Sequence, residues 1–385
     1  MGRGGKAMNN NAEAADSPSL EGTGAVVARE WFLAVSVITC AIFFAFGDVL
    51  FAGLSSYLGL TLLFVWLFAV VVGSALGVVR HAEAISERLG EPYGTLVLTL
   101  SITAIEVMSI TAVMLHGEQN LTLVRDTLFS VVMILMGGMT GLSLLLGAIK
   151  HREQTINLQG ANAYLGVIVP LAVLSLVLPD FTSSTEGPTL SLVQKIMVGS
   201  IAAGLYVTFL LIQTGRHRSY FTQPAMAEQA EPHSHGPLAR HIALLLAYIL
   251  PVVFLVEQLA RPIDYIIETL DAPQMVGGVM VAILVATPEG IGGIKAALRN
   301  QLQTSVNVFL GSVLATIGLT VPIMLVLSQM LGIDLILGLK ADNLVLLLLM
   351  LAVSVITFSS GRTNLLQGAV HLLLFVAFLI LLFQG

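Results

Sequence analysis

Eleven long apolar stretches recur along this chain, and they limit what it can fold into more than any other feature. Each holds about 20 mostly apolar residues, the length that a helix needs to cross the hydrocarbon core of a bilayer. The stretches lie at residues 31–48, 57–79, 93–116, 125–149, 161–178, 190–213, 239–257, 274–298, 304–331, 343–360 and 363–384. Charged residues make up only 10% of the 385 positions, against about 25% in an ordinary soluble domain. The sequence therefore predicts an all-α polytopic membrane protein with 11 transmembrane helices.

The distribution of positive charge predicts how these helices are oriented. Cytoplasmic loops of membrane proteins carry an excess of Lys and Arg. With the N-terminus placed in the cytoplasm, 13 of the 17 Lys and Arg residues fall in cytoplasmic segments or at the adjoining helix ends. The other four are Arg125, Lys195, Arg261 and Lys340. We therefore expect a cytoplasmic N-terminus and an external C-terminus.

Residues 1–30 differ from a secretory signal peptide. They are rich in Gly, Ala and Asn, and no apolar run follows Met1 directly, whereas a signal peptide has a basic start followed by a short apolar core. We expect residues 1–30 to be a disordered cytoplasmic tail and residues 31–48 to be a transmembrane helix rather than a cleaved leader.

A polar segment at residues 214–238 divides the remaining spans into two sets. With 31–48 set aside as an extra helix, five spans lie within residues 57–213 and five within residues 239–385. Because five is odd, the second set must enter the membrane from the opposite side. The sequence thus predicts two inverted five-helix repeats, a plan in which transporters hold their substrate near the midplane between the repeats.

The polar segment between the two sets contains His233 and His235. A His-x-His pair in a Pro-containing polar stretch is most simply part of a plain cytoplasmic linker. The alternative is a pH or cation sensor, because histidine titrates near neutral pH.

Two carboxylates lie near the middle of predicted spans, Glu106 in 93–116 and Glu289 in 274–298. A charged side chain at that depth costs at least about 2.5–3.5 kcal/mol on insertion scales, so such groups usually face a cavity, a partner or an ion path. Each glutamate lies in the second helix of its repeat. These matching positions favour a functional pair over two protonated side chains that merely link neighbouring helices.

Other oxygen atoms near the two glutamates could complete the coordination of a cation. Thr99, Thr103 and Glu106 share one helix face, since they are four and three residues apart. Pro288 frees the carbonyl group of Leu284, and calcium takes about 6–8 oxygen ligands. The candidate cation- and proton-binding residues are Glu106, Glu289, Thr103, Thr287, Asn307 and Ser312, followed by the second-tier candidates Ser130, Gln303, Thr99 and Leu284.

Two carboxylates can also hold two protons, which an arriving divalent cation would displace. Exchange of a cation for protons then needs only this one site, and metal cations and protons are the expected partners. A cation channel is the rival from another class, because acidic side chains also line channel pores. We find no nucleophile-and-base pair or nucleotide motif, and no basic patch with aromatic residues for nucleic acid. We therefore expect a secondary transporter without a cofactor, not an enzyme.

The order and spacing of four segments carry a family resemblance. They are RHAEAISERLGEPYGTLVLTLSITAIE (80–106), RDTLFSVVMI (125–134), GAIKHREQTINLQGANA (147–163) and ATPEGIGGIKAALRNQLQTSVNVFLGSVLATIGLTVP (286–322). These segments resemble the calcium/cation antiporter superfamily, in particular its bacterial calcium/proton antiporters of the ChaA type. The resemblance implies an extra helix plus two inverted repeats, alternating access, a bacterial inner-membrane location, and export of Ca²⁺, or of Na⁺ or K⁺, against inward proton flow.

The resemblance assigns the acidic residues of the two repeat motifs to Glu106 and Glu289. Members of the wider superfamily typically have Gly-Asn four and three residues before each glutamate, whereas this chain has Ile-Thr at 102–103 and Val-Ala at 285–286. Two amide oxygens of the family's ion site are therefore missing. The cation stays open between Ca²⁺ and a pair of alternatives, Na⁺ or K⁺ with little Ca²⁺ activity.

Overall fold

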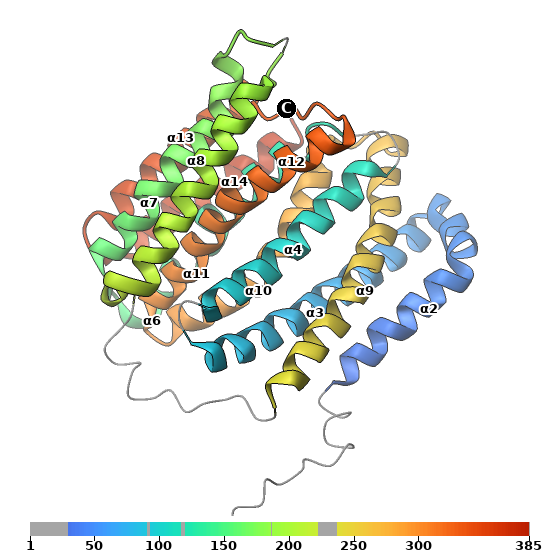
Figure 1. Ribbon diagram of the computed structural model, residues 1–385, viewed down its shortest axis with the longest axis horizontal. Helices are drawn as coiled ribbons and strands as arrows, with labels where there is room; N and C mark the ends of the chain where they lie inside the picture. The colour runs from blue at the N-terminus through green and yellow to red at the C-terminus, as the bar shows by residue number, and fades with distance from the viewer. Residues whose placement is uncertain (1–29, 91–92, 117–119, 186, 222–236, 385) are drawn as a thin grey trace, which may run out of the picture.

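The fold is a single bundle of long helices that lie side by side (Figure 1). This computed structural model describes residues 30–90, 93–116, 120–185, 187–221 and 237–384. Within those residues, 11 helical runs are long and apolar enough to cross a membrane, which confirms the predicted number. The expected tail, apart from Glu30, and the pair His233 and His235 lie outside the described residues.

The first six spans and the connections after them have the following bounds. They are α2 (Trp31–Phe51) with η1 (Ala52–Ser55); α3 (Tyr57–Leu89); α4 (Tyr93–Leu115); α5 (Leu123–Val132), η2 (Met133–Met139) and α6 (Thr140–His151), then β1 (Gln154–Thr155); α7 (Leu158–Ala172), η3 (Val173–Val177) and η4 (Leu178–Phe181); and α8 (Leu192–Leu211), η5 (Ile212–Arg216) and η6 (Arg218–Tyr220).

The last five spans and the connections after them have the following bounds. They are α9 (Leu238–Asp264) with η8 (Tyr265–Thr269); α10 (Met275–Leu298); α11 (Leu302–Ala315), η9 (Thr316–Thr320) and α12 (Val321–Leu331); α13 (Ala341–Phe358), then β2 (Arg362–Thr363); and α14 (Leu365–Leu382).

Two helices extend well beyond their apolar stretches. Helix α3 continues to Leu89, where the stretch ended at residue 79, and α9 with η8 continues to Thr269 rather than residue 257. The added turns of α3 carry the charged side chains of Arg80, Glu83, Glu87 and Arg88, so an apolar window could not detect them. Helix α3 ends at Gly90, whose φ of 63° is a conformation that glycine adopts at no steric cost.

The third span of each repeat is interrupted near its middle by a π-helical segment, η2 in the first repeat and η9 in the second. Such segments are rare, and they often occur at functional sites. Their matching positions show that the two halves share a local distortion as well as a helix count.

The two halves also exchange matching loop contacts at opposite ends of the bundle. Strand β1, after the third span of the first repeat, pairs antiparallel with β2, before the fifth span of the second. At the other end the roles of the repeats are reversed. There the backbone N–H groups of Leu337 and Gly338, after the third span of the second repeat, donate to the carbonyl oxygen of Pro188, before the fifth span of the first, both at 3.2 Å. This exchange is what inverted repeats require.

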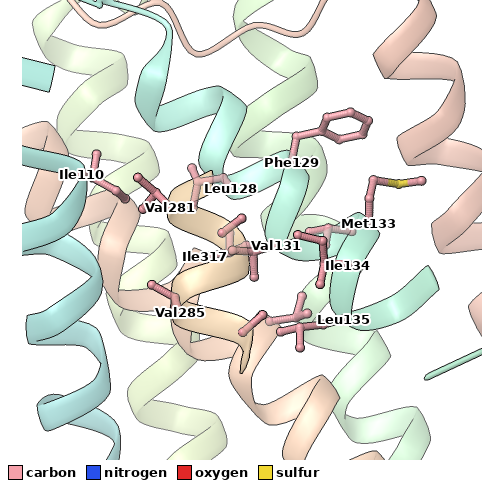
Figure 2. Packing of buried hydrophobic residues seen from close by; sticks show 14 of the residues in the cluster. Ile110, Leu128, Phe129, Val131, Met133, Ile134, Leu135, Val281, Val285 and Ile317 are labelled. Atoms are coloured by element: carbon pink, nitrogen blue, oxygen red, sulfur yellow. The ribbon is translucent and has the colours of Figure 1, made fainter. Parts of the chain in front are cut away.

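The centre of the bundle is packed with apolar side chains from both repeats. Figure 2 shows Leu128 and Val131 of α5 beside Val281 and Val285 of α10. Helices α5 and α10 come close at Gly278, where an added Cβ would lie only 2.7 Å from Asp126. Lipid tails are as apolar as these side chains, so close packing rather than release of water holds such helices together.

The start of α2 and the end of α14 lie at opposite ends of the bundle. In Figure 1 the C-terminus lies at the top, whereas α2 begins at the bottom. With an odd number of spans, the first span must begin at the end of the bundle opposite to the one at which the last span ends. For brevity, the end at which α2, α4 and α11 begin is called the near end below, and the opposite end is called the far end.

Candidate functional site

Both mid-membrane glutamates line a single cavity between the repeats. Glu106 of α4 and Glu289 of α10 contribute to its wall, and its volume is about 320 Å³. Their exposed fractions are 1% and 9%. The cavity therefore brings together two carboxylates that are 183 residues apart in the sequence.

The cavity runs from the two glutamates toward the near end. Its lining includes Glu83, close to the end of α3, Thr95, close to the start of α4, and Thr304, close to the start of α11. Gln213 of η5 lies on the same wall, and its amide donates to the hydroxyl of Tyr164 at 2.9 Å. The path from the glutamates to this end therefore carries several polar side chains among apolar ones such as Val79 and Leu98.

Beyond the glutamates the bundle presents apolar side chains. On α10, Val285 and Val281 lie one and two turns farther from the near end than Glu289, and on α4 Ile110 lies one turn beyond Glu106. These three side chains and Ile317 of η9 are at most 4% exposed, and they gather in the packed layer of Figure 2. This apolar layer separates the glutamates from the far end.

Four of the other predicted site residues share the cavity with the glutamates. Thr99, Thr103, Asn307 and Ser312 all contribute to its lining. Asn307 also donates its amide to the carbonyl oxygen of Phe221 at 2.6 Å, which leaves its side-chain oxygen to accept from Gln303 at 2.9 Å. Its oxygen would have to exchange that partner to reach a cation.

The remaining candidates lie outside the cavity lining. The hydroxyl of Thr287 donates to the carbonyl oxygen of Ile283 at 2.6 Å, and the hydroxyl of Ser130 donates to that of Asp126 at 2.6 Å. Both therefore bond within their own helices.

Gln303 and Leu284 also differ from the expectation. The side-chain oxygen of Gln303 accepts the backbone N–H of Asn157 at 2.7 Å, so it supports the start of α7. Leu284 lines a small neighbouring void together with Pro288 and Glu289. The carbonyl group that Pro288 frees therefore belongs to the surroundings of Glu289 rather than to the main cavity.

The two glutamates have different hydrogen-bond partners. Thr316, in the π-helical segment η9, donates its hydroxyl to Oε2 of Glu106 at 3.0 Å. Among the described residues, Oε1 of Glu106 and both carboxylate oxygens of Glu289 are buried without a hydrogen-bond partner. Buried polar atoms are nearly always paired in proteins, so three unpaired oxygens in one cavity are suited to a cation or to protons.

Thr316 is a site residue that sequence reasoning missed. It lies four residues after Ser312, so the two hydroxyls share one helix face. That spacing is the one feature of the sequence that could have added Thr316 to the candidate site residues. The hydrogen bond from Thr316 to Glu106, between two different helices, has no comparable sequence pattern.

The cavity lacks the features of a resident metal centre. Across the part of the chain that the structure describes, no group of three or more His, Cys, Asp and Glu side chains is arranged to hold a metal ion. The cavity lining offers oxygens from the carboxylates of Glu83, Glu106 and Glu289, from hydroxyl groups and from the amides of Gln213 and Asn307, a set that suits a hard cation bound transiently.

Comparison with known proteins gives consistent matches across most of the chain. The family described as sodium/calcium exchanger protein matches residues 59–215 and 240–384. The sodium-potassium/proton antiporter ChaA of Escherichia coli is 41% identical over 320 residues, which cover 81% of this chain and 86% of that protein. The Ca²⁺/H⁺ antiporter ChaA of Bacillus subtilis is 24% identical over 314 residues, or 80% and 87% of the two chains. The solved structure of native YfkE matches with a TM-score of 0.68 at 20% identity, covering 88% of this chain and 100% of that one.

Proposed function

Because the chain belongs to the sodium/calcium exchanger family, we propose that Glu106 and Glu289 bind an exported cation and incoming protons in turn. The protein is a multi-pass membrane protein and a cation/proton antiporter of the ChaA type. The observation that carries the proposal is the set of three unpaired, buried carboxylate oxygens at the closed end of one cavity.

The direction of transport follows from the proposed orientation. The excess of Lys and Arg places the near end in the cytoplasm, so the cavity faces inward. A cation that enters from the cytoplasm displaces the protons of the two carboxylates. The apolar layer at Val281 and Val285 then separates as the repeats rearrange, and the site opens to the far side. Protons replace the cation there. The protonated site then returns to face the cytoplasm.

Ca²⁺ is the cation that we propose first. Two carboxylates balance its charge, and Thr103, Ser312 and Asn307 line the same cavity with further oxygens. The second candidate is Na⁺ or K⁺. The Ile-Thr and Val-Ala pairs at 102–103 and 285–286 supply no amide oxygen, and the E. coli relative at 41% identity is a sodium-potassium/proton antiporter.

Purified protein in liposomes distinguishes these candidates. A pH gradient is imposed, Ca²⁺, Na⁺ and K⁺ are added in turn, and a dye reports the internal pH. We expect proton movement on addition of the transported cation, and none with Glu289→Gln. Glu257→Gln is the matched control, since Glu257 is an exposed carboxylate on α9 that does not line the cavity. A voltage-driven cation flux without proton movement would instead identify a channel.

A further inference from the structure

A second cluster of titratable groups, buried except for the side chain of Arg80, lies outside the transport cavity, toward the near end of the bundle. Glu30 precedes α2, Arg80 and His81 lie on α3, and His241 and Tyr248 lie on α9. The exposed fractions of Glu30, His81 and His241 are 7%, 3% and 7%, and that of Tyr248 is 1%. The cluster therefore joins the first helix of each repeat to the extra helix that belongs to neither.

Glu30 holds the three helices together through one carboxylate oxygen. Its Oε2 accepts the hydroxyl of Tyr248 at 3.0 Å and forms a salt bridge with the guanidinium of Arg80. The same oxygen lies 3.4 Å from Nε2 of His81. Arg80 and His81 are also within hydrogen-bond distance, at 3.3 Å.

The two histidines meet directly. Nδ1 of His81 lies 3.1 Å from Nδ1 of His241, and the ring centroids are 5.3 Å apart. A neutral imidazole has one N–H donor and one accepting nitrogen, whereas a charged imidazolium has two donors. This contact therefore requires that one Nδ1 donates and the other accepts. A proton bound to the accepting Nδ1 would place two donors face to face and end the hydrogen bond.

The charged groups around the pair come from all three helices. The carboxylate of Glu30 faces it from the start of α2, and the guanidinium of Arg80 faces it from α3. From α9 come the phenol of Tyr248 and the neighbouring Arg240, which has a partner of its own. Arg80 offsets the charge of Glu30, so a further proton on the pair adds a net positive charge to these named groups.

Helix α3 connects this cluster to the transport cavity. Val79 and Glu83 line the cavity, whereas His81, which lies between them in the sequence, contacts α9. The ring of Tyr248 packs on Gly77, where an added Cβ would lie 2.6 Å from the ring. The cluster thus fixes the helix that forms one wall of the cavity against both α2 and α9.

We propose that Glu30, His81 and His241 form a second proton-binding site, through which pH at the near end controls the rate of transport. When the histidine pair is neutral, the hydrogen bond is intact and the three helices are docked. Proton uptake breaks the contact, loosens α3 from α9 and slows transport. The inference rests on the proposed antiport, and it adds a regulatory proton to the transported ones.

Competition at the two transport glutamates also depends on pH, but in a separable way. Protons that compete with the cation raise its KM, and saturating cation overcomes them. Protons bound at the second site lower Vmax, and saturating cation does not restore it. The double variant His81→Asn with His241→Asn removes the second effect, because asparagine can donate or accept near the position of Nδ1 but does not titrate.

The experiment measures Vmax in liposomes at saturating cation, while the pH on the near side is lowered from about 8 to about 4, a range that extends below the usual titration of histidine because the pair is buried. We expect Vmax of the wild type to fall severalfold and that of the double variant to stay constant, with the pH dependence of KM unchanged in both. His217→Asn, a histidine outside the cluster, is the matched control and should fall like the wild type. An equal fall of Vmax in the double variant would overturn the proposal.

A second measurement needs no transport. We expect the unfolding temperature of the wild type in detergent to decrease over the same pH range, and that of the double variant to decrease clearly less. Equal decreases would contradict the second site even if antiport were never detected. Proton-coupled transport with an unaltered Vmax profile in the double variant would instead leave the proposed function intact and reject this inference alone.

Discussion

Glu106 and Glu289 occupy corresponding positions in the two repeats, yet their immediate neighbours differ. Thr316 donates a hydrogen bond to Glu106, whereas both oxygens of Glu289 lack a partner in the described structure. The segment η9 that carries Thr316 has its counterpart in η2, whose sequence MILMGGM has no hydroxyl side chain. The two carboxylates therefore differ in their immediate chemical surroundings.

Replacing Thr316 tests this difference. Thr316→Val keeps the shape of the side chain and removes the hydroxyl, so Oε2 of Glu106 loses the hydrogen bond that it accepts. A hydrogen bond to a charged group contributes about 1.5–3 kcal/mol, which corresponds to a rise in the KM of the cation of at least about tenfold. Thr316→Ser should restore most of the affinity. Flux measurements over a range of cation concentrations check this, and an unchanged KM in Thr316→Val would refute the role.

Single-residue reasoning from the sequence could use the depth of a side chain in the membrane, but it could not show which hydrogen bonds that side chain makes. The positions of Glu106 and Glu289 in the middle of apolar spans were sufficient to place both in one cavity. The side chains of Thr287, Ser130 and Gln303 have equally suitable chemistry, but nearby carbonyl or N–H groups already occupy them. Spacing along the chain does not show whether a hydroxyl or amide is already used.

The interrupted third span is the element that most distinguishes the structure from a set of straight helices. The π-helical η2 packs against α14, and His371 of α14 contacts it directly. Nδ1 of His371 lies 2.6 Å from the carbonyl oxygen of Met136, and Nε2 lies 3.0 Å from the hydroxyl of Thr357. Three residues beyond Met136, Met139 fills the space over Gly290, next to Glu289. One buried histidine thus supports the segment that packs beside the site.

Substitution of His371 should destabilise this region. His371→Leu removes two buried hydrogen bonds and leaves the carbonyl of Met136 and the hydroxyl of Thr357 without them. An unsatisfied buried polar group costs about 1–3 kcal/mol, so we expect a clear decrease in the unfolding temperature in detergent. His371→Asn, which retains a donor, should lose less. Equal stability of wild type and His371→Leu would contradict this role for the histidine.

Close contact between α6 and α14 depends on glycine. A Cβ added at Gly368 would lie 2.6 Å from the backbone nitrogen of Leu145 and 2.9 Å from the carbonyl oxygen of Gly141. Gly368→Ala should therefore push the helices apart, at a cost of about 1–3 kcal/mol for overpacking. Gly166→Ala, in another span with nothing within 4 Å of an added Cβ, is the control and should unfold like the wild type.

At the scale of the whole molecule, hydrophobic spacing was sufficient to predict the 11 spans. The contacts between the halves could not be predicted in the same way. Glu30, His81 and His241 are separated by 51 and 160 residues in the sequence, so their meeting depends on how α2, α3 and α9 pack. The extra length of α3, which carries His81 and Glu83, also lay outside the apolar window.

The orientation of the whole molecule is a further prediction. The bias of Lys and Arg places the near end in the cytoplasm, and an odd number of spans then places the C-terminus outside. A reporter that is active only in the cytoplasm, fused after residue 385, should be inactive, whereas the same reporter fused at the N-terminus should be active. Activity of the C-terminal fusion would invert the proposed direction of the cavity.

The central claim is that one pair of carboxylates binds either the cation or protons. Its most direct test is the release of protons when purified protein in weakly buffered detergent solution binds the cation that drives exchange in liposomes. We predict that binding releases protons, and that Glu289→Gln reduces this release while Glu257→Gln does not. Cation binding without proton release, or an equal release from Glu289→Gln, would contradict the exchange at Glu106 and Glu289.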